Sequence, residues 1–340
     1  MRPGGTHRYA AFAGTGSALP ERVVPNAWFE SLVDTSDEWI VDRTGIRERH
    51  FATEGETTSD LAAEAAQSAL EAAGLVPEQV DLLVVATLTA DRPLPSAAVI
   101  VQRKLGLACP AFDINAACAG FSYATTVATS MIESGAAENA VVIGAEILSR
   151  LLNLADRSTC VLFGDGAGAA VLVPSAEPGV LASTLSADGG QAELLTVPAG
   201  GAERRLTPEG IASGEDKIHM VSGREVFRRA VTDMSAACRS LMDKAGVTPD
   251  DIDVLIPHQA NARIVTAVGQ RLGIPPERSV LDMATVGNTS AASIPIALDR
   301  AVRAGRVKPG DLVLMASFGA GLAWGATLVR WTGVPGGEAR

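Results

Sequence analysis

DINAACAGF, residues 113–121, is the most informative stretch of this chain. The residues before its cysteine, 110–114, are typical of a short strand, and residues 119–134, rich in small and apolar side chains, of a helix. Cys118 would then lie at a helix N-terminus, where unpaired N–H groups and the helix dipole favour a thiolate. Small neighbours leave room for substrate beside the sulfur. The stretch therefore predicts an activated nucleophile.

The alternative is that Cys118 is an inert core residue, because free cysteine usually behaves as a small buried hydrophobe. Cys109, Cys160 and Cys238 are predicted to be of that kind, since their neighbours are apolar and no partner is evident. A catalytic role for Cys118 requires a proton carrier and an oxyanion site elsewhere in the chain.

His258 is the candidate proton carrier, in PHQAN, residues 257–261. A strand is predicted to end at Pro257, with His258 opening the next helix, which repeats the arrangement around Cys118. Histidine exchanges protons near neutral pH, although a lone histidine is as often structural.

Asn288 and a glycine-rich loop complete the set. Asn288 lies in GNTSAAS, residues 287–293, where a turn or helix cap is the alternative interpretation. The loop FGAG, residues 318–321, could direct backbone N–H groups at an oxyanion, or be an ordinary turn.

Together these motifs resemble β-ketoacyl-acyl-carrier-protein synthase III, a family of the thiolase superfamily. Further matches are TSDEWI at 35–40, RTGIRER at 43–49 and FGDGAGAA at 163–170. The matches follow the family order from about residue 13 to residue 331. The resemblance implies a decarboxylative condensation of an acyl-CoA primer with malonyl-acyl-carrier protein, which initiates fatty-acid or polyketide synthesis. An acyltransferase that moves the acyl group to another acceptor in specialised metabolism is the alternative.

The resemblance also implies roles for single residues. Cys118 would carry the acyl group as a thioester, while His258 and Asn288 donate hydrogen bonds to the enolate oxygen formed by decarboxylation. The backbone N–H groups of Cys118 and Ala320 would hold the tetrahedral oxyanion. Many relatives have glycine at position 320, and alanine fits if its φ is negative.

Related enzyme classes differ at these positions. Elongating ketosynthases have a second histidine where this chain has Asn288, and thiolases need a cysteine in the C-terminal glycine loop, here residues 317–321. Plant-type polyketide synthases share the triad, but lack the two segments at 35–40 and 43–49.

Binding residues follow from the same resemblance. The expected coenzyme A and pantetheine contacts are Trp39, Arg43, Arg157, Phe227 and Asn261. Phe318 resembles a gate over the cysteine. Leu94 falls where relatives often have an aromatic residue that closes the acyl pocket across the dimer interface, so leucine is expected to admit primers longer or more branched than acetyl.

Arginines around the strand before His258 are candidates for docking the acyl-carrier protein, with a solvated face as the alternative. They are Arg228, Arg229 and Arg263, with Arg224 and Arg271 nearby.

Composition agrees with an enzyme of metabolism. Hydrophobic residues make up 47% of the 340 residues, which predicts an ample core, and the net charge of −11 disfavours nucleic-acid binding. There is no apolar run long enough for a membrane span and no leader-like segment in residues 1–9. Four cysteines without a CxxC pair suggest a reducing, cytoplasmic location.

The resemblance also implies the partners of the chain. No cofactor or metal is expected, and acyl-CoA, acyl-carrier protein and a second copy of the chain are the expected partners.

An α/β fold with a weak internal duplication is predicted. A helix at 61–73 and a strand at 80–86 resemble a helix at 226–245 and a strand at 252–256, each pair joined by Gly-x-x-Pro. The family implies a thiolase-like fold with five αβαβα layers and two βαβ-rich halves, residues 1–178 with Cys118 and 179–340 with His258 and Asn288. The glycines at 164–168 are predicted to be structural, because no helix start or P-loop lysine follows.

Two functions of other classes remain open on the residues alone. A cysteine hydrolase would use Cys118 and His258 with water, Asn288 orienting the histidine, but no protease signature surrounds Cys118. A noncatalytic acyl-CoA-binding subunit would not need a nucleophile at all.

Overall fold

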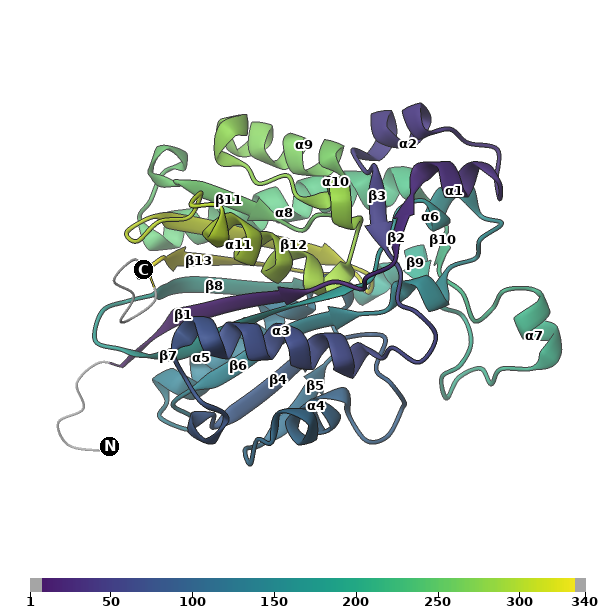
Figure 1. The fold of residues 1–340 in the computed structure, drawn as a ribbon. Helices are drawn as coiled ribbons and strands as arrows, with labels where there is room; N and C mark the ends of the chain where they lie inside the picture. Colours follow the sequence, from purple (N-terminus) through teal and green to yellow (C-terminus); the bar gives the residue numbers. More distant parts are fainter. Residues whose placement is uncertain (1–7, 334–340) are drawn as a thin grey trace.

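Two mixed β-sheets form the frame of the computed structural model, which describes residues 8–333 (Figure 1). The expectation about a leader therefore rests on residues that lie mostly outside the description. The first sheet has the order β1 (Tyr9–Ala18), β7 (Gly166–Ser175), β6 (Ala140–Glu146), β4 (Leu82–Ala86) and β5 (Ala111–Ile114). The second has the order β8 (Val180–Ala187), β13 (Ala323–Arg330), β12 (Leu312–Gly319) and β11 (Val254–Pro257).

The two sheets repeat one pattern of strand directions. In the first, β1 and β7 are antiparallel, β7 and β6 antiparallel, and β6 and β4 parallel. In the second, β8 and β13 are antiparallel, β13 and β12 antiparallel, and β12 and β11 parallel. The chain passes from one sheet to the other between Ser175 and Val180. The duplication predicted from two helix–strand pairs thus extends to the whole sheet topology.

Helices form the other three layers. The outer face of the first sheet is covered by α3 (Thr58–Ala73) and α4 (Ala97–Leu105), and the outer face of the second by α8 (Gly223–Ala245) and α9 (Ala262–Leu272), at the opposite side of the molecule in Figure 1. Between the sheets lie α5 (Gly120–Glu133) and α11 (Ser293–Arg303). This is the predicted α/β fold with five layers.

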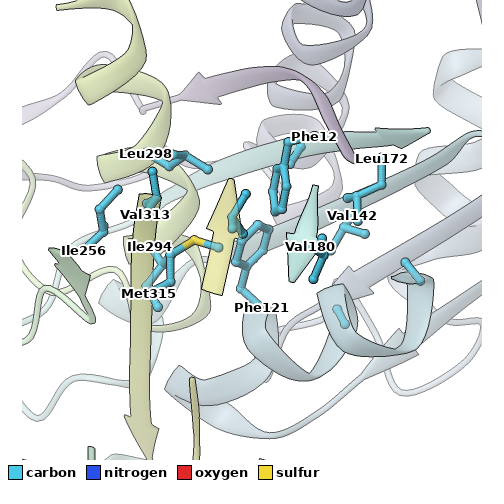
Figure 2. Close-up of a cluster of buried hydrophobic side chains, with 14 of the residues drawn as sticks. Phe12, Phe121, Val142, Leu172, Val180, Ile256, Ile294, Leu298, Val313 and Met315 are labelled. Carbon is cyan, nitrogen blue, oxygen red and sulfur yellow. The ribbon is translucent and has the colours of Figure 1, made fainter. Parts of the chain in front are cut away.

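The central layer holds a continuous apolar core. Figure 2 shows Phe121 of α5 and Ile294 of α11 among side chains from both sheets, including Phe12, Val180 and Met315, all buried. Full burial of a large apolar side chain is worth about 1.5–3 kcal/mol of transfer free energy. The core therefore holds the two halves of the molecule together as well as each half internally.

The predicted helix–strand pairs are confirmed with small shifts at their ends. Both α3 and α8 end at a glycine in the left-handed region, Gly74 with φ 66° and Gly246 with φ 69°. Short 3-10 turns starting at Pro77 and Pro249 then lead into β4 and β11. A glycine C-cap followed by proline is the usual way to stop a helix, which is why this spacing could be recognised in the sequence.

One predicted element is wrong in its position. The helix after His258 begins only at Ala262, because Asn261 is its N-cap and accepts a hydrogen bond from the Arg263 N–H at 2.8 Å. His258 therefore lies in the turn between β11 and α9. The glycines at 164–168 are structural as predicted; a Cβ at Gly168 would lie 2.5 Å from the Ile296 nitrogen.

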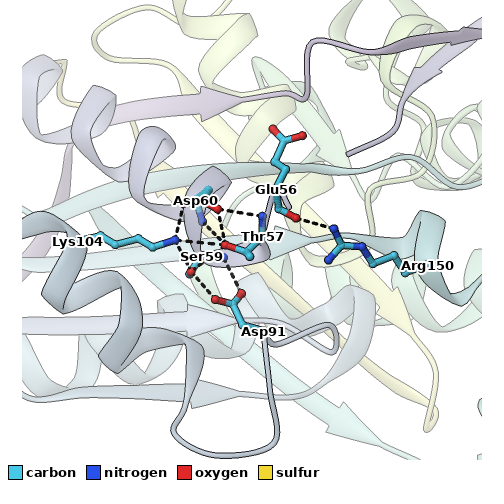
Figure 3. Close-up of polar contacts among 7 residues, drawn as sticks. All are labelled: Glu56, Thr57, Ser59, Asp60, Asp91, Lys104 and Arg150. Carbon is cyan, nitrogen blue, oxygen red and sulfur yellow. Dashed lines mark hydrogen bonds and ion pairs between the residues drawn. The ribbon is translucent and has the colours of Figure 1, made fainter. Parts of the chain in front are cut away.

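A polar network anchors the loop between β4 and α4 (Figure 3). The Asp91 carboxylate accepts hydrogen bonds from the Ser59 N–H at 2.9 Å and its hydroxyl at 2.5 Å, while the Lys104 ammonium contacts Asp60 and Ser59. These contacts sit on the capped N-terminus of α3. They fix the base of the loop that carries Leu94, whose side chain is left 83% exposed.

Shorter elements surround the entrance to the interior. They are β2 (Val23–Pro25), β3 (Glu48–His50), β9 (Leu195–Thr196), β10 (His219–Met220), α1 (Asn26–Glu30), α2 (Asp37–Thr44), α6 (Arg157–Cys160), α7 (Pro208–Ala212) and α10 (Met283–Val286). Of these, α7 projects from the body of the molecule (Figure 1). Across residues 8–333, every helix is too short or too polar to span a lipid bilayer.

Candidate active site

Cys118 lies in the 3-10 turn Ala117–Ala119, between β5 and α5. The turn begins in the left-handed region, with Ala117 at φ 46°. Its backbone is tightly covered by the end of β12: a Cβ at Gly319 would lie 2.6 Å from the Cys118 nitrogen and 3.0 Å from the Ala119 nitrogen. Only glycine leaves room for this approach, which brings the loop of Ala320 beside the backbone N–H of Cys118.

The thiol is not the preformed thiolate that its place before a helix predicts. Burial raises the pKa of Cys118 to about 12, outweighing a hydrogen bond from the Ser290 side chain that favours the thiolate. Cys109, Cys160 and Cys238 are buried too, and burial raises the pKa of each. What distinguishes Cys118 is access, because within the described residues it alone of the four lines the cavities below.

His258 is held by both its backbone and its ring. Its N–H donates to the Ala316 carbonyl of β12 at 2.7 Å, and its Nδ1 lies 2.5 Å from the Ser293 hydroxyl at the start of α11. The same hydroxyl oxygen accepts the Gln259 N–H at 3.3 Å. We assign the serine proton to the bond with Nδ1, which places the ring proton on Nε2, toward the cavity. Burial lowers the pKa of His258 to about 4.

Asn288 is fixed from two sides. Its backbone N–H donates to the Leu162 carbonyl at 2.9 Å, and its carbonyl accepts the Gly164 N–H at 3.0 Å. Its side-chain Oδ1 accepts the Ser290 N–H at 2.9 Å. Because Oδ1 is occupied in this way, the Nδ2 amine is the part of the side chain available to a ligand.

Two cavities meet at Cys118. The first, about 590 Å³, is lined by Cys118, His258 and Asn288 and reaches the surface between α2, α8 and α9. The second, about 790 Å³, extends from Cys118 toward β9 and Leu148, and none of its described lining residues is charged. Phe163, Ala320 and Leu322 border both. The sulfur thus stands where two cavities meet, the first lined in part by arginines and the second by uncharged side chains.

The first cavity gathers the predicted coenzyme A contacts. Its lining includes Trp39, Arg43, Arg157, Phe227 and Asn261. The Arg157 and Arg43 guanidinium carbons lie 4.7 Å and 5.7 Å from the centre of the Trp39 ring. Asn261, besides capping α9, donates from Nδ2 to the Arg43 carbonyl at 3.0 Å. The outer part of this cavity is therefore cationic and aromatic, as a binding site for an adenine nucleotide would be.

The predicted gate and oxyanion residues border the sulfur. Phe318 is buried in β12 and lines the first cavity with Cys118. Ala320 follows β12, and among the described non-glycine residues only Ala117 and Ser290 have a positive φ. Ala320 therefore meets the backbone condition set by its side chain.

The three arginines predicted to dock the acyl-carrier protein differ in their charge partners and in their position relative to the first cavity. Arg229 is bound by the carboxylates of Asp188 and Asp233 at 2.9 Å and 2.8 Å, so its charge is compensated. Arg228 has an exposed side chain paired with Glu225. Arg263 lines the first cavity, with its guanidinium carbon 5.9 Å from the centre of the Phe227 ring.

Leu94 lies outside the lining of the two cavities of its own chain, and its side chain is exposed. A role in closing an acyl pocket would therefore require a second copy of the chain.

Sequence reasoning missed three functional candidates: Glu146, Ser290 and Ser293. The two serines stand inside the motif that carries Asn288, but nothing in the spacing shows which atoms they bind. Glu146 ends AVVIGAE, residues 140–146, and an acidic residue closing a buried apolar strand was a signal that could have been used. Within residues 8–333 there is no cluster of three metal-binding side chains.

Comparison with known proteins points to one family. The family model described as 3-Oxoacyl-[acyl-carrier-protein (ACP)] synthase III matches residues 112–189, and the model of its C-terminal part matches residues 242–331. Among curated proteins, the beta-ketoacyl-[acyl-carrier-protein] synthase III of Rhizorhabdus wittichii is 51% identical over 327 residues, covering 95% of this chain and 100% of the relative.

Solved structures agree with this. The 3-oxoacyl-[acyl-carrier-protein] synthase III of Aquifex aeolicus has a TM-score of 0.87 and 48% identity, covering 95% of this chain and 100% of its own. The priming beta-ketosynthase of the R1128 polyketide biosynthetic pathway has a TM-score of 0.91 and 37% identity, covering 98% and 99%.

We predict that the ring of His258 stays neutral throughout the neutral pH range. Burial disfavours the imidazolium, and a pKa of about 4 in place of 6.5 moves protonation into acid. Nitrogen-15 NMR of histidine-labelled protein should show Nε2 protonated and Nδ1 unprotonated, with the signal assigned by its loss in His258→Asn. A midpoint near the unperturbed value would contradict this, as would the opposite tautomer.

Proposed function

The chain belongs to the 3-oxoacyl-[acyl-carrier-protein] synthase III family, and we propose that it condenses an acyl group from coenzyme A with a malonyl group on an acyl-carrier protein. The product is a β-ketoacyl-carrier protein, the first intermediate of fatty-acid or polyketide synthesis. The observation that carries the proposal is the position of Cys118, where a cationic channel meets a cavity lined by uncharged side chains.

Acyl transfer to the enzyme comes first. The nucleotide of coenzyme A binds the outer channel at Trp39 and Arg157, and the pantetheine arm passes Phe227 and Asn261. The acyl chain enters the second, uncharged cavity. Attack by the sulfur makes a tetrahedral oxyanion, which the backbone N–H groups of Cys118 and Ala320 stabilise.

Condensation follows in the same channel after coenzyme A leaves. The malonyl group loses carbon dioxide, and the enolate oxygen that forms accepts hydrogen bonds from His258 Nε2 and Asn288 Nδ2. A neutral imidazole with its proton on Nε2 is suited to this step, because it donates without being consumed as an acid. Each preorganised donor is worth on the order of 10²–10³-fold in rate. The enolate carbon then attacks the acyl thioester of Cys118.

The acyltransferase alternative is not favoured. Transfer to an alcohol or amine forms no enolate, whereas here Ser290 and Ser293 hold Asn288 and His258 so that both present a donor. The family shown by the comparisons is also named for synthases.

The test is to mix the protein with a panel of acyl-CoAs, then add malonyl-acyl-carrier protein, and follow intact mass. We expect an acyl adduct that is absent in Cys118→Ala, kept in Cys109→Ala, and discharged as β-ketoacyl-carrier protein. An adduct that ignores malonyl-carrier protein would point to another acceptor. The absence of any adduct would remove Cys118 as the nucleophile.

Carrier docking is proposed at the exposed face of α8 beside the channel entrance. Arg228→Glu should raise KM for malonyl-carrier protein about fivefold and weaken its salt dependence, while acylation by acyl-CoA stays unchanged. Arg103→Glu, an exposed arginine on α4 at the opposite side of the molecule, is the control. Equal KM values in the two variants would place docking elsewhere.

The primer is proposed to be longer or more branched than acetyl. The second cavity, about 790 Å³ and open to the surface, has room for more than a two-carbon group. Acylation by isobutyryl- or octanoyl-CoA should therefore be at least as fast as by acetyl-CoA.

If the protein is a homodimer in which Leu94 borders the partner's second cavity, Leu94→Phe should shift the preference toward acetyl-CoA. Leu281 is another exposed leucine, and Leu281→Phe should leave the preference unchanged. A strict acetyl preference of the unaltered protein would refute the proposal.

A further inference from the structure

Glu146 is a buried carboxylate that has no cationic partner among residues 8–333. It ends β6 and has no exposed surface. Its carboxylate accepts hydrogen bonds from Thr89 Oγ1 at 2.5 Å, Thr87 Oγ1 at 3.3 Å and the Leu88 N–H at 3.2 Å, all from the loop after β4. Leaving a carboxylate in the interior is costly, so a buried one supported only by neutral donors calls for a functional explanation.

Ser290 links this carboxylate to the nucleophile. Its hydroxyl donates to Glu146 Oε1 at 3.3 Å, and it lines the second cavity together with Cys118, whose thiolate it can stabilise as a donor. The serine is held for this by its backbone, which adopts φ 51° and donates its N–H to Asn288. A serine hydroxyl has one proton and two lone pairs, so it can accept from the thiol while donating to the carboxylate.

Cys118 needs a proton acceptor, and His258, with its proton assigned to Nε2, faces the shared cavity as a donor. The thiol is fully protonated at neutral pH, since burial raises its pKa to about 12. The ring of His258 presents Nε2–H to the channel, and none of the described contacts of Cys118 is with that ring. Burial raises the pKa of Glu146 to about 7, so close to neutral pH it exists partly as the base and partly as the acid.

In the part of the chain that the structure describes, the other groups around Glu146 are uncharged. The loop after β4 contributes two threonine hydroxyls and an amide, η7 (Ser290–Ala292) contributes Ser290, and η2 (Ala117–Ala119) contributes the one titratable neighbour, Cys118. On β7, Gly166 pairs with Glu146 and has no side chain, and the carboxylate of the preceding Asp165 binds Ala52 and Ser149 instead.

We propose that Glu146, acting through the hydroxyl of Ser290, takes the proton of Cys118 during acylation and returns it after condensation. The inference rests on the proposed function and assigns the proton transfers in it. As the sulfur–carbon bond forms, the thiol proton passes to the Ser290 oxygen and the serine proton passes to Glu146 Oε1. Coenzyme A leaves as its thiolate and takes a proton from water.

The second half-reaction restores the starting state. When the enolate carbon attacks the acyl thioester, the bond to Cys118 breaks and the electron pair stays on sulfur. Ser290 gives its proton to this thiolate and receives the proton stored on Glu146. The carboxylate is then ionised again, and over a full cycle the one proton consumed is the proton that ends on coenzyme A.

The experiment measures single-turnover acylation of the full-length protein by acyl-CoA as a function of pH. The unaltered protein should acylate faster as pH rises through the titration of Glu146 near 7. Glu146→Gln, which keeps the shape but cannot accept the proton, should slow acylation on the order of 10²-fold at neutral pH and abolish this inflection. Ser290→Gly removes the hydroxyl, tolerates the left-handed backbone, and should have the same effect. The double variant should be no slower than either single one.

Thr89 provides a readout that a purely structural role of Glu146 would not move. Thr89→Val removes a donor to the carboxylate but leaves the path through Ser290 intact. Because that hydrogen bond lowers the pKa of Glu146, its loss should shift the inflection to higher pH, and Thr89→Ser should restore it. Thermal unfolding of each variant identifies any that fails to fold.

The rate of Cys118 alkylation by iodoacetamide against pH separates the relay from the proposed function. If no acyl-CoA acylates the unaltered protein but the alkylation inflection near 7 is lost in Glu146→Gln, the proposed function fails and the relay stands. If acylation occurs and folded Glu146→Gln stays within about threefold of the unaltered rate, well below the contribution of a general base, the relay is refuted. An inflection that survives in both single variants refutes it as well.

Discussion

The close approach of two backbone segments at Gly319, and again at Gly144, is the constraint on which the site depends. Gly319 of β12 covers the turn of Cys118, and a Cβ there would lie 2.6 Å from its nitrogen. Gly144 of β6 covers η7, and a Cβ there would lie 2.2 Å from the Ala291 carbonyl oxygen. Each sheet thus supports the turn that belongs to the other half. A methyl group at either position would separate groups that must act within hydrogen-bond distance.

The two supported turns are related by the internal duplication. Asn115 and Asn288 each accept, through Oδ1, the N–H of the residue two positions later, and those residues are the two non-glycine residues with positive φ in the described chain. Each turn leads directly into a helix of the central layer. Cys118 corresponds in this comparison to Ala291. The two halves share one backbone conformation at this turn but carry different side chains on it. The first half places the nucleophile Cys118 there, and the second places Asn288, which donates to the enolate, and the hydroxyl of Ser290.

Much of this could be predicted from the sequence, because it is carried by local patterns. Glycine followed by proline after a helix predicts the repeated pairs. The motifs around Cys118, His258 and Asn288 predict a candidate site, and these three residues line one cavity. Quantities that depend on packing could not be predicted. The helix dipole suggested a low pKa for Cys118, but desolvation raises it, and burial is a tertiary property. His258 was placed in a helix because the capping role of Asn261 was not recognised. Arg229 cannot be told from its neighbours in the sequence, because Asp188, which compensates its charge, is 41 residues away.

Because each half supports the turn of the other, the active site can form only when both halves have folded. Ser317 of β12 and Ser122 of α5, one turn beyond the nucleophile, are hydrogen-bonded at 2.8 Å although 195 residues separate them. Contacts of such long range form late in folding, after the segments between them have collapsed. During synthesis the first half emerges with its thiol but without Gly319, Ala320, His258 or Asn288. A nascent or truncated chain therefore has no thioester-cleaving activity, which arises only when the fold is complete.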